Sequence, residues 1–232
     1  MLSLLERRSL HLCRGDRLGD PFEGSFTQGS LDAFRVQQGT EFRDDHRRYW
    51  TLAPRWSYVS CWHLAEAESA ALWAIYGGRN AIAVKSTVDR LRAAIPELET
   101  REGDVLVSQG VRRVIYIDYR ATHPHLNDLM GPLCYKRLAF SYESEIRAIR
   151  QELRSVESSS RSGGRALDAG APPGILGREM PVTLRDMISA IYVAPRAPAW
   201  YLQIVQAVIR RYDLNDLQCH QSSLDELPEF GL

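Results

Sequence analysis

Two glutamates, Glu143 and Glu145, stand two positions apart in an apolar run that covers residues 138–149. In an extended segment, residues i and i+2 point to the same face, so a strand here has to place both carboxylates in one space. Neighbouring carboxylates repel each other, which favours a proton on one of them near neutral pH while the other stays ionised. Such a pair suits chemistry that forms a cation and moves a proton. A Glu-x-Glu edge that faces solvent is the commoner arrangement, because glutamate is mostly exposed in proteins.

The composition is ordinary for a soluble globular protein of 232 residues, with 44% hydrophobic and 25% charged residues. Lys and Arg number 29, as do Asp and Glu, so the formal net charge is zero. This balance argues against binding nucleic acid through a bulk electrostatic field, although a local basic groove stays possible.

Cysteine usage and the N-terminus indicate a cytoplasmic protein that does not enter a membrane. The four cysteines are isolated and show no Cys-x-x-Cys spacing, which is typical of a reducing compartment. Residues 1–8 carry charge too early for a signal peptide. No run approaches the ~20 apolar residues that a helix needs to cross a bilayer.

The pattern along the chain predicts an α+β fold in which strands outnumber helices and do not alternate with them regularly. Strands are expected at residues 9–14, 56–62, 81–84, 138–149, 187–193 and 218–224, with a hairpin formed by residues 105–107 and 111–119. Helices are expected at residues 31–36, 41–50, 65–76, 87–95 and 198–209. We expect one domain over residues 1–232. Residues 154–178, rich in Ser, Gly and Pro, form its flexible insertion.

Several common sites are missing from the sequence. It contains neither the Gly-x-Gly-x-x-Gly of a dinucleotide-binding fold nor the Gly-rich Lys-Ser/Thr loop of a P-loop protein. It also lacks His-Glu-x-x-His and any Cys/His cluster. His123 and His125 supply half of a metal site at most, since a stable zinc site needs three or four ligands. No metal is therefore expected.

Three segments, in order, resemble the Arg-Ser-Glu class of ADP-ribosyltransferases, the cholera-toxin-like group. The first is the strand-like LCRGD at residues 12–16, which contains Arg14, and the second is a strand that ends in Ser60. The third is Glu143-Ser144-Glu145, the Glu-x-Glu of the family. The family's Ser-Thr-Ser is here Ser60-Cys61-Trp62, so only Ser60 is carried over.

The resemblance implies a split antiparallel sheet, NAD as substrate and a macromolecular acceptor of ADP-ribose. Loss of nicotinamide leaves a ribosyl cation, similar to the oxocarbenium state of glycoside cleavage. By resemblance, Glu145 stabilises this cation, Glu143 orients or deprotonates the nucleophile, and Ser60 orients Glu145. Arg14 holds the NAD side with its planar guanidinium. Candidates for stacking on nicotinamide are Trp62, Trp73 and Tyr76.

A second resemblance covers most of residues 9–225. The segments at 17–24 (RLGDPFEG), 58–62 (YVSCW), 68–73 (ESAALW) and 142–147 (YESEIR) look like a bacterial and phage-associated domain family of unknown function. Some members of that family lie beside phage-resistance genes, which implies a toxin or phage-defence setting with a possible neutralising partner. Here Asp20, Pro21 and Glu23 are expected to shape a loop beside the site, since Asp-Pro followed by Gly is also a turn signal.

Other interpretations of the same residues remain open. Arg14 can pair with Asp16 or Asp20 in its own loop, and Ser60 can be a strand serine satisfied by the backbone. A non-enzymatic partner or sensor of a defence system fits the altered Ser-Cys-Trp segment. A metal-independent nuclease using Glu143, His63 and nearby arginines is a third hypothesis.

Overall fold

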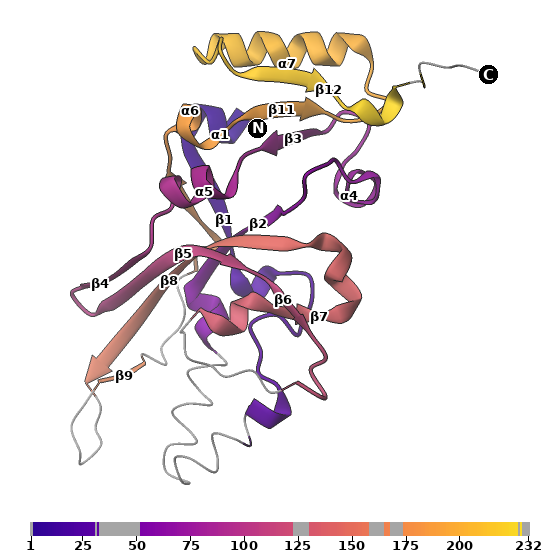
Figure 1. Ribbon diagram of the computed structural model, residues 1–232. Coiled ribbons are helices and arrows are strands. Elements are labelled where there is room, and N and C mark those ends of the chain that lie inside the picture. The colour runs from indigo at the N-terminus through magenta and orange to yellow at the C-terminus, as the bar shows by residue number, and fades with distance from the viewer. Residues whose placement is uncertain are drawn as a thin grey trace. The chain divides into compact units, whose positions relative to one another are not determined.

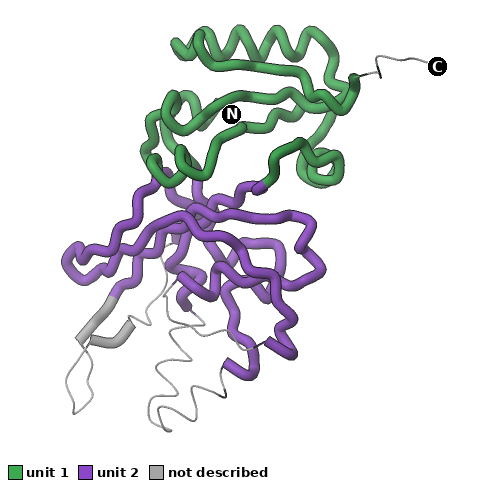
Figure 2. The backbone as a smooth tube through the Cα atoms, viewed as in Figure 1, with its two compact units in different colours: residues 1–10, 65–94, 181–232 green, residues 11–64, 95–180 purple. Residues whose placement is uncertain are grey.

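The computed structural model describes residues 2–30, 32, 52–122, 130–157, 165–167, 174–226 and 228. The chain groups into two compact units (Figure 2). Unit 1 contains residues 1–10, 65–94 and 181–232, and unit 2 contains residues 11–64 and 95–180. Each unit is thus assembled from segments far apart in the sequence. That one domain spans the chain stays a prediction.

A large sheet dominates unit 2, with strand order β10-β1-β2-β8-β5-β4 and β9 paired to β8 (Figure 1). The pairs β1–β2, β2–β8, β8–β5 and β5–β4 are antiparallel. Its strands are β1 (Ser9–Arg14), β2 (Ser57–His63), β4 (Leu98–Glu102), β5 (Val105–Arg113), β8 (Glu145–Glu157), β9 (Arg165–Leu167) and β10 (Gly177–Pro181). The aromatic and β-branched residues of β2 favour this extended, half-buried conformation.

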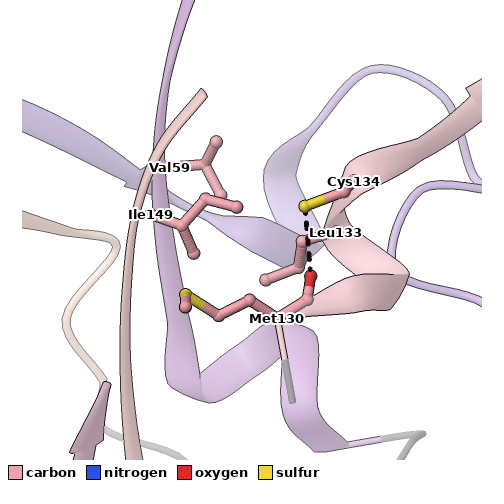
Figure 3. Packing of buried hydrophobic residues seen from close by; sticks show 5 residues of the cluster. All are labelled: Val59, Met130, Leu133, Cys134 and Ile149. Carbon is pink, nitrogen blue, oxygen red and sulfur yellow. Dashed lines mark hydrogen bonds between the residues drawn. The ribbon is translucent and has the colours of Figure 1, made fainter. Parts of the chain in front are cut away.

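The longest strand, β8, lies between β2 and β5 and carries the predicted glutamates at its start. On one face of the sheet, Val59 of β2 and Ile149 of β8 pair directly. They pack with Met130, Leu133 and Cys134, which lie in or beside the short 3₁₀ helix η3 (Gly131–Cys134) (Figure 3). We call these five residues the apolar floor.

Short elements complete unit 2. A two-stranded parallel sheet joins β6 (Ile115–Ile117) and β7 (Tyr135–Arg137). The 3₁₀ helices η1 (Gly15–Arg17), η2 (Ala53–Trp56) and η4 (Leu138–Glu143) connect strands.

Unit 1 contains a three-stranded sheet of order β12-β11-β3, in which β11 is parallel to β12 and antiparallel to β3. Its strands are β3 (Ile82–Lys85), β11 (Ala190–Val193) and β12 (Gln218–Gln221). Its helices are α1 (Leu2–Arg7), α4 (Ala70–Tyr76), α5 (Val88–Ala94), α6 (Leu184–Met187) and α7 (Ala199–Arg211), followed by the 3₁₀ helix η5 (Ser223–Asp225). Helix α7 buries Val205 and Ile209, four residues apart, as an amphipathic helix does.

The α+β class is confirmed, and the structure has an antiparallel sheet as its main element. The hairpin predicted from residues 105–107 and 111–119 is wrong, because Gly110 lies inside β5 and pairs with Ile149. The actual turn contains Gly103, which has φ +60° and joins β4 to β5. The predicted strand at 187–193 begins only at Ala190.

Other expectations fall partly or wholly outside the described residues. These include the helix at 41–50, most of the helix at 31–36, and the histidines at 123 and 125. Of the predicted insertion at 154–178, residues 154–157 belong to β8 and residues 165–167 form β9. Within the described part of the chain, no helix combines the length and apolar character that a bilayer crossing requires.

Glu68 joins two parts of unit 1. Its carboxylate accepts hydrogen bonds from the Trp73 indole at 2.9 Å and from the Ser223 backbone N–H at 3.0 Å. Burial alone raises the pKa of Glu68, but hydrogen bonds from Ser222, Trp73 and Ser223 outweigh it and lower the pKa below its usual 4.5. Glu68 thus links the start of α4 to η5.

We expect Glu68→Ala to lower the free energy of unfolding by about 1 kcal/mol at pH 7, the typical worth of hydrogen bonds of this kind. A folded-state pKa below the unfolded value makes this contribution complete above about pH 4.5 and removes it as the pH falls through the folded pKa. Urea unfolding at several pH values measures the difference. Glu66→Ala, at an exposed position two residues away, is the control. A difference from wild type that persists unchanged into acid contradicts the role of the ionised carboxylate.

Candidate functional site

Glu143 and Glu145 lie in a buried cluster of five charged side chains in unit 2. The other three members are Glu23, Lys136 and Arg147. Glu143 ends η4, Glu145 and Arg147 belong to β8, and Lys136 lies in β7. All five side chains are at most 7% exposed, and that of Arg147 is 0% exposed. We call these five residues the charge cluster.

Lys136 links the two predicted carboxylates. Its Nζ donates to Glu145 Oε1 at 2.6 Å and to Glu143 Oε2, and it lies 3.5 Å from Glu23 Oε1. The Phe140 ring lies against the same ammonium, 4.8 Å from Nζ to the ring centroid. Lys136 is therefore the point at which the three carboxylates meet.

Arg147 is the second cation of the charge cluster and contacts two of its carboxylates. Its Nε donates to Glu145 Oε2 at 2.7 Å, and its Nη2 donates to Glu23. Its Nη1 donates to the Leu133 carbonyl at 2.6 Å, which connects the cluster to the apolar floor drawn in Figure 3. Each nitrogen of this fully buried guanidinium thus has an acceptor, as burial of a charge requires.

The backbone between the glutamates differs from the extended segment that the sequence predicted. Glu143 ends a 3₁₀ helix, and Ser144 has a left-handed conformation with φ 42°. The carboxylates still converge on Lys136, because the turn at Ser144 brings the end of η4 beside the start of β8. The Ser144 carbonyl accepts from the Leu64 N–H at 2.8 Å, and the Tyr116 hydroxyl accepts from the Glu145 N–H at 2.8 Å.

Glu23 comes from the Asp-Pro-Phe-Glu-Gly loop. Asp20 forms the turn by accepting the Phe22 N–H at 3.1 Å, and it pairs with Arg137 at 2.9 Å. Gly24, with φ +76°, follows directly, and a Cβ there would stand 2.7 Å from Pro54 Cγ. Asp20 thus shapes the loop, whereas the Glu23 side chain enters the charge cluster itself.

The charge cluster contains three carboxyl groups and two basic groups. With all five groups ionised, three carboxylates against two cations leave a formal charge of −1. Burial alone raises the pKa of Glu145, but hydrogen bonds with Arg147, Glu143 and Lys136 and the charge of Arg147 outweigh it and hold that pKa well below the usual range. Burial alone lowers the pKa of Lys136. The hydrogen bonds of Glu143 and Glu145 and the charges of Glu23 and Glu145 outweigh this effect and raise that pKa. Glu145 and Lys136 are therefore charged at neutral pH.

Arg14 and Ser60 lie on the other face of the sheet. Arg14 pairs across β1 and β2 with Tyr58, whereas the β2 residue paired with Glu145 is His63. Because side chains alternate along a strand, Tyr58 and Ser60 point away from the face that carries Glu145. Ser60 pairs with Ala148, not with a member of the cluster.

Arg14 instead forms the local pair that the sequence left open as an alternative. Its Nε and Nη2 donate to the two Asp16 carboxylate oxygens at 2.6 and 3.0 Å. Its Nη1 donates to the Ile175 carbonyl at 3.4 Å. The guanidinium is thus engaged by its own loop and by the segment before β10.

The three aromatic candidates are not brought together. Trp62 lies in β2 on the same face as Ser60, opposite the glutamates. Trp73 and Tyr76 belong to α4 in unit 1; the indole of Trp73 bonds to Glu68, and Tyr76 is 69% exposed. The rings that adjoin Lys136 and Arg137 are Phe22 and Phe140.

Comparison with protein-family models, with curated proteins and with solved structures finds no match to this chain. Among the described residues, no group of three or more His, Cys, Asp and Glu is arranged to hold a metal ion.

Three members of the charge cluster were not singled out as site residues from the sequence. Arg147 carries a usable signal, because it stands two residues after Glu145 in an apolar strand and so shares its face. Glu23 lies in the Asp-Pro-Phe-Glu-Gly loop. The turn signal of this loop already accounted for the segment, so no contact of Glu23 with the glutamates was predicted. Lys136 had no signal, because β7 is only three residues long and pairs with β6 rather than with the large sheet.

Proposed function

We propose that the protein cleaves the N-glycosidic bond of NAD and transfers ADP-ribose to a macromolecular acceptor, inside a bacterium and in a toxin or phage-defence role. The observation that carries the proposal is the convergence of Glu143 and Glu145 on Lys136 in a buried cluster in which Glu145 stays ionised. NAD is the substrate, and no metal takes part.

Cleavage of NAD is a reaction that a buried carboxylate of this kind can promote. Departure of nicotinamide leaves positive charge on the ribose C1′ and its ring oxygen, as in glycoside cleavage. An ionised carboxylate in a water-poor site stabilises developing positive charge more strongly than it does in water. Glu145, whose lowered pKa keeps it ionised, is the carboxylate to which we assign this role.

The structure suggests a different support for Glu145 from the one that the resemblance implies. Arg147 and Lys136 each donate to one Glu145 oxygen, at 2.7 and 2.6 Å. Two fixed donors orient a carboxylate at least as firmly as one serine hydroxyl does. Our proposal therefore gives the positioning role to Arg147 and Lys136 and leaves Ser60 and Arg14 outside the reaction.

The test is incubation of purified protein with NAD labelled on its adenylate part, with and without cell lysate, beside the Glu145→Gln protein. Label on a macromolecule together with free nicotinamide, both from the wild type alone, supports the transferase and shows the acceptor class on a gel. Absence of both from folded wild-type protein, with protein and nucleic-acid acceptors supplied, rejects it.

A second candidate function is a non-enzymatic partner or sensor in a defence system. It is favoured by the internal pairing of the cluster, in which Lys136 and Arg147 are both fully engaged by neighbouring acceptors, and by the pairing of Arg14 with Asp16. Calorimetry that detects no NAD binding, together with a partner that co-purifies in fixed stoichiometry, supports this candidate over the enzyme.

A further inference from the structure

His63 is an exposed histidine at the edge of the charge cluster. It is the last residue of β2 and pairs across the ladder with Glu145, so the two side chains share a face of the sheet. A hydrogen bond fixes the orientation of its ring, because Nδ1 lies 2.6 Å from the backbone carbonyl oxygen of Glu143. The imidazole is thus held against the backbone of Glu143, one of the two predicted glutamates.

This hydrogen bond fixes the tautomer of the neutral ring. A carbonyl oxygen only accepts, so Nδ1 has to carry the hydrogen and Nε2 has to present its lone pair. Among the described residues, none forms a hydrogen bond with that Nε2. A histidine oriented in this way is a base whose direction is set before any substrate arrives.

Glu143 is less suited to taking a proton. It is buried, and Lys136 donates to its Oε2. A base has to lie within hydrogen-bond reach of the proton that it removes. At this edge of the sheet the His63 side chain is exposed to solvent, whereas the Glu143 carboxylate is buried.

We propose that His63 is the general base of the transfer step, an inference that rests on the proposed function. The bond between the ribose C1′ and the pyridinium nitrogen breaks, and its electron pair neutralises the departing nicotinamide. A lone pair of the acceptor, or of water, forms the new bond to C1′. The proton that the acceptor loses passes to His63 Nε2, and the imidazolium then returns it to solvent.

Two substitutions test this. His63→Asn places an amide N–H where Nδ1 stands, so it keeps the hydrogen bond to Glu143 and removes the base. His63→Ala leaves space for added imidazole. We expect both to lower label transfer and ADP-ribose formation by about 100-fold or more, with NAD affinity unchanged, since a general base contributes about 10²–10⁴-fold. Added imidazole restores activity to His63→Ala, which a purely structural role does not explain. His220→Asn, an exposed strand histidine of unit 1, is the control.

An activity-independent measurement accompanies the kinetics. Long-range ¹⁵N–¹H correlation of the imidazole identifies the ring nitrogen that carries the hydrogen, and we expect Nδ1 in His63. Wild-type rates in His63→Asn, or a hydrogen on Nε2, overturn the role of His63 and leave the proposed function standing. A wild type that releases no nicotinamide overturns the proposed function and the reaction that His63 serves.

Discussion

Replacement of Arg147 by methionine is expected to lower the free energy of unfolding by about 3–5 kcal/mol, the usual cost of removing one partner from a buried ion pair. The guanidinium is fully buried and donates to Glu145, Glu23 and the Leu133 carbonyl. Methionine fills a similar length without a charge, so Glu145 and Glu23 keep only Lys136 as a cationic partner, and the Leu133 carbonyl loses its donor. Against a typical total of about 5–15 kcal/mol, this loss is severe.

Urea unfolding followed by circular dichroism measures the effect. Arg185→Met is the matched control, because Arg185 and Asp216 form a pair in which both side chains are more than half exposed. Such a pair is worth about 0–1 kcal/mol. Adding Glu23→Gln to Arg147→Met should recover part of the loss, since one uncompensated carboxylate is then removed. A cost for Arg147→Met as small as that for Arg185→Met contradicts the picture of a buried ionic cluster.

The sequence predicted local properties of the site better than its assembly. The prediction that Glu143 and Glu145 share one space was right in its outcome and wrong in its reason, because a turn at Ser144, and not an extended strand, brings the two carboxylates together. The order of the three motifs placed Arg14 and Ser60 in the site, but they lie on the other face of the sheet, because motif order carries no information on strand register. A shift of one residue moves a side chain to the other face.

Contacts between residues far apart in the sequence could not be predicted, for a different reason. Lys136 meets the glutamates through a short parallel strand, and Glu23 meets Arg147 across 124 positions of the chain. Buried charges have to be compensated, and this requirement does favour a nearby cation once two carboxylates are buried. It does not say which of the 29 basic residues supplies it.

The substitution that most directly tests the proposed chemistry is Glu145→Gln. It keeps the size of the side chain but removes the charge that we assign to the ribosyl cation. One of its two terminal atoms becomes an NH₂ group that faces a donor, either Lys136 Nζ or Arg147 Nε. We expect nicotinamide release to fall by about 10²–10³-fold, the range found when one preorganised electrostatic contact is removed from an active site.

Glu152→Gln is the matched control for this prediction. Glu152 lies on the same strand, β8, seven residues further on, and so on the opposite face; it is 14% exposed and pairs with Arg150 and Arg178. It therefore undergoes the same chemical change with loss of comparable ion pairs, but away from the charge cluster. Urea unfolding of both variants separates loss of catalysis from loss of fold. If folded Glu145→Gln releases nicotinamide as fast as wild type, Glu145 is not the carboxylate that faces the cation. If Glu152→Gln loses as much activity as Glu145→Gln, the loss comes from weakening the sheet and not from the missing charge in the site.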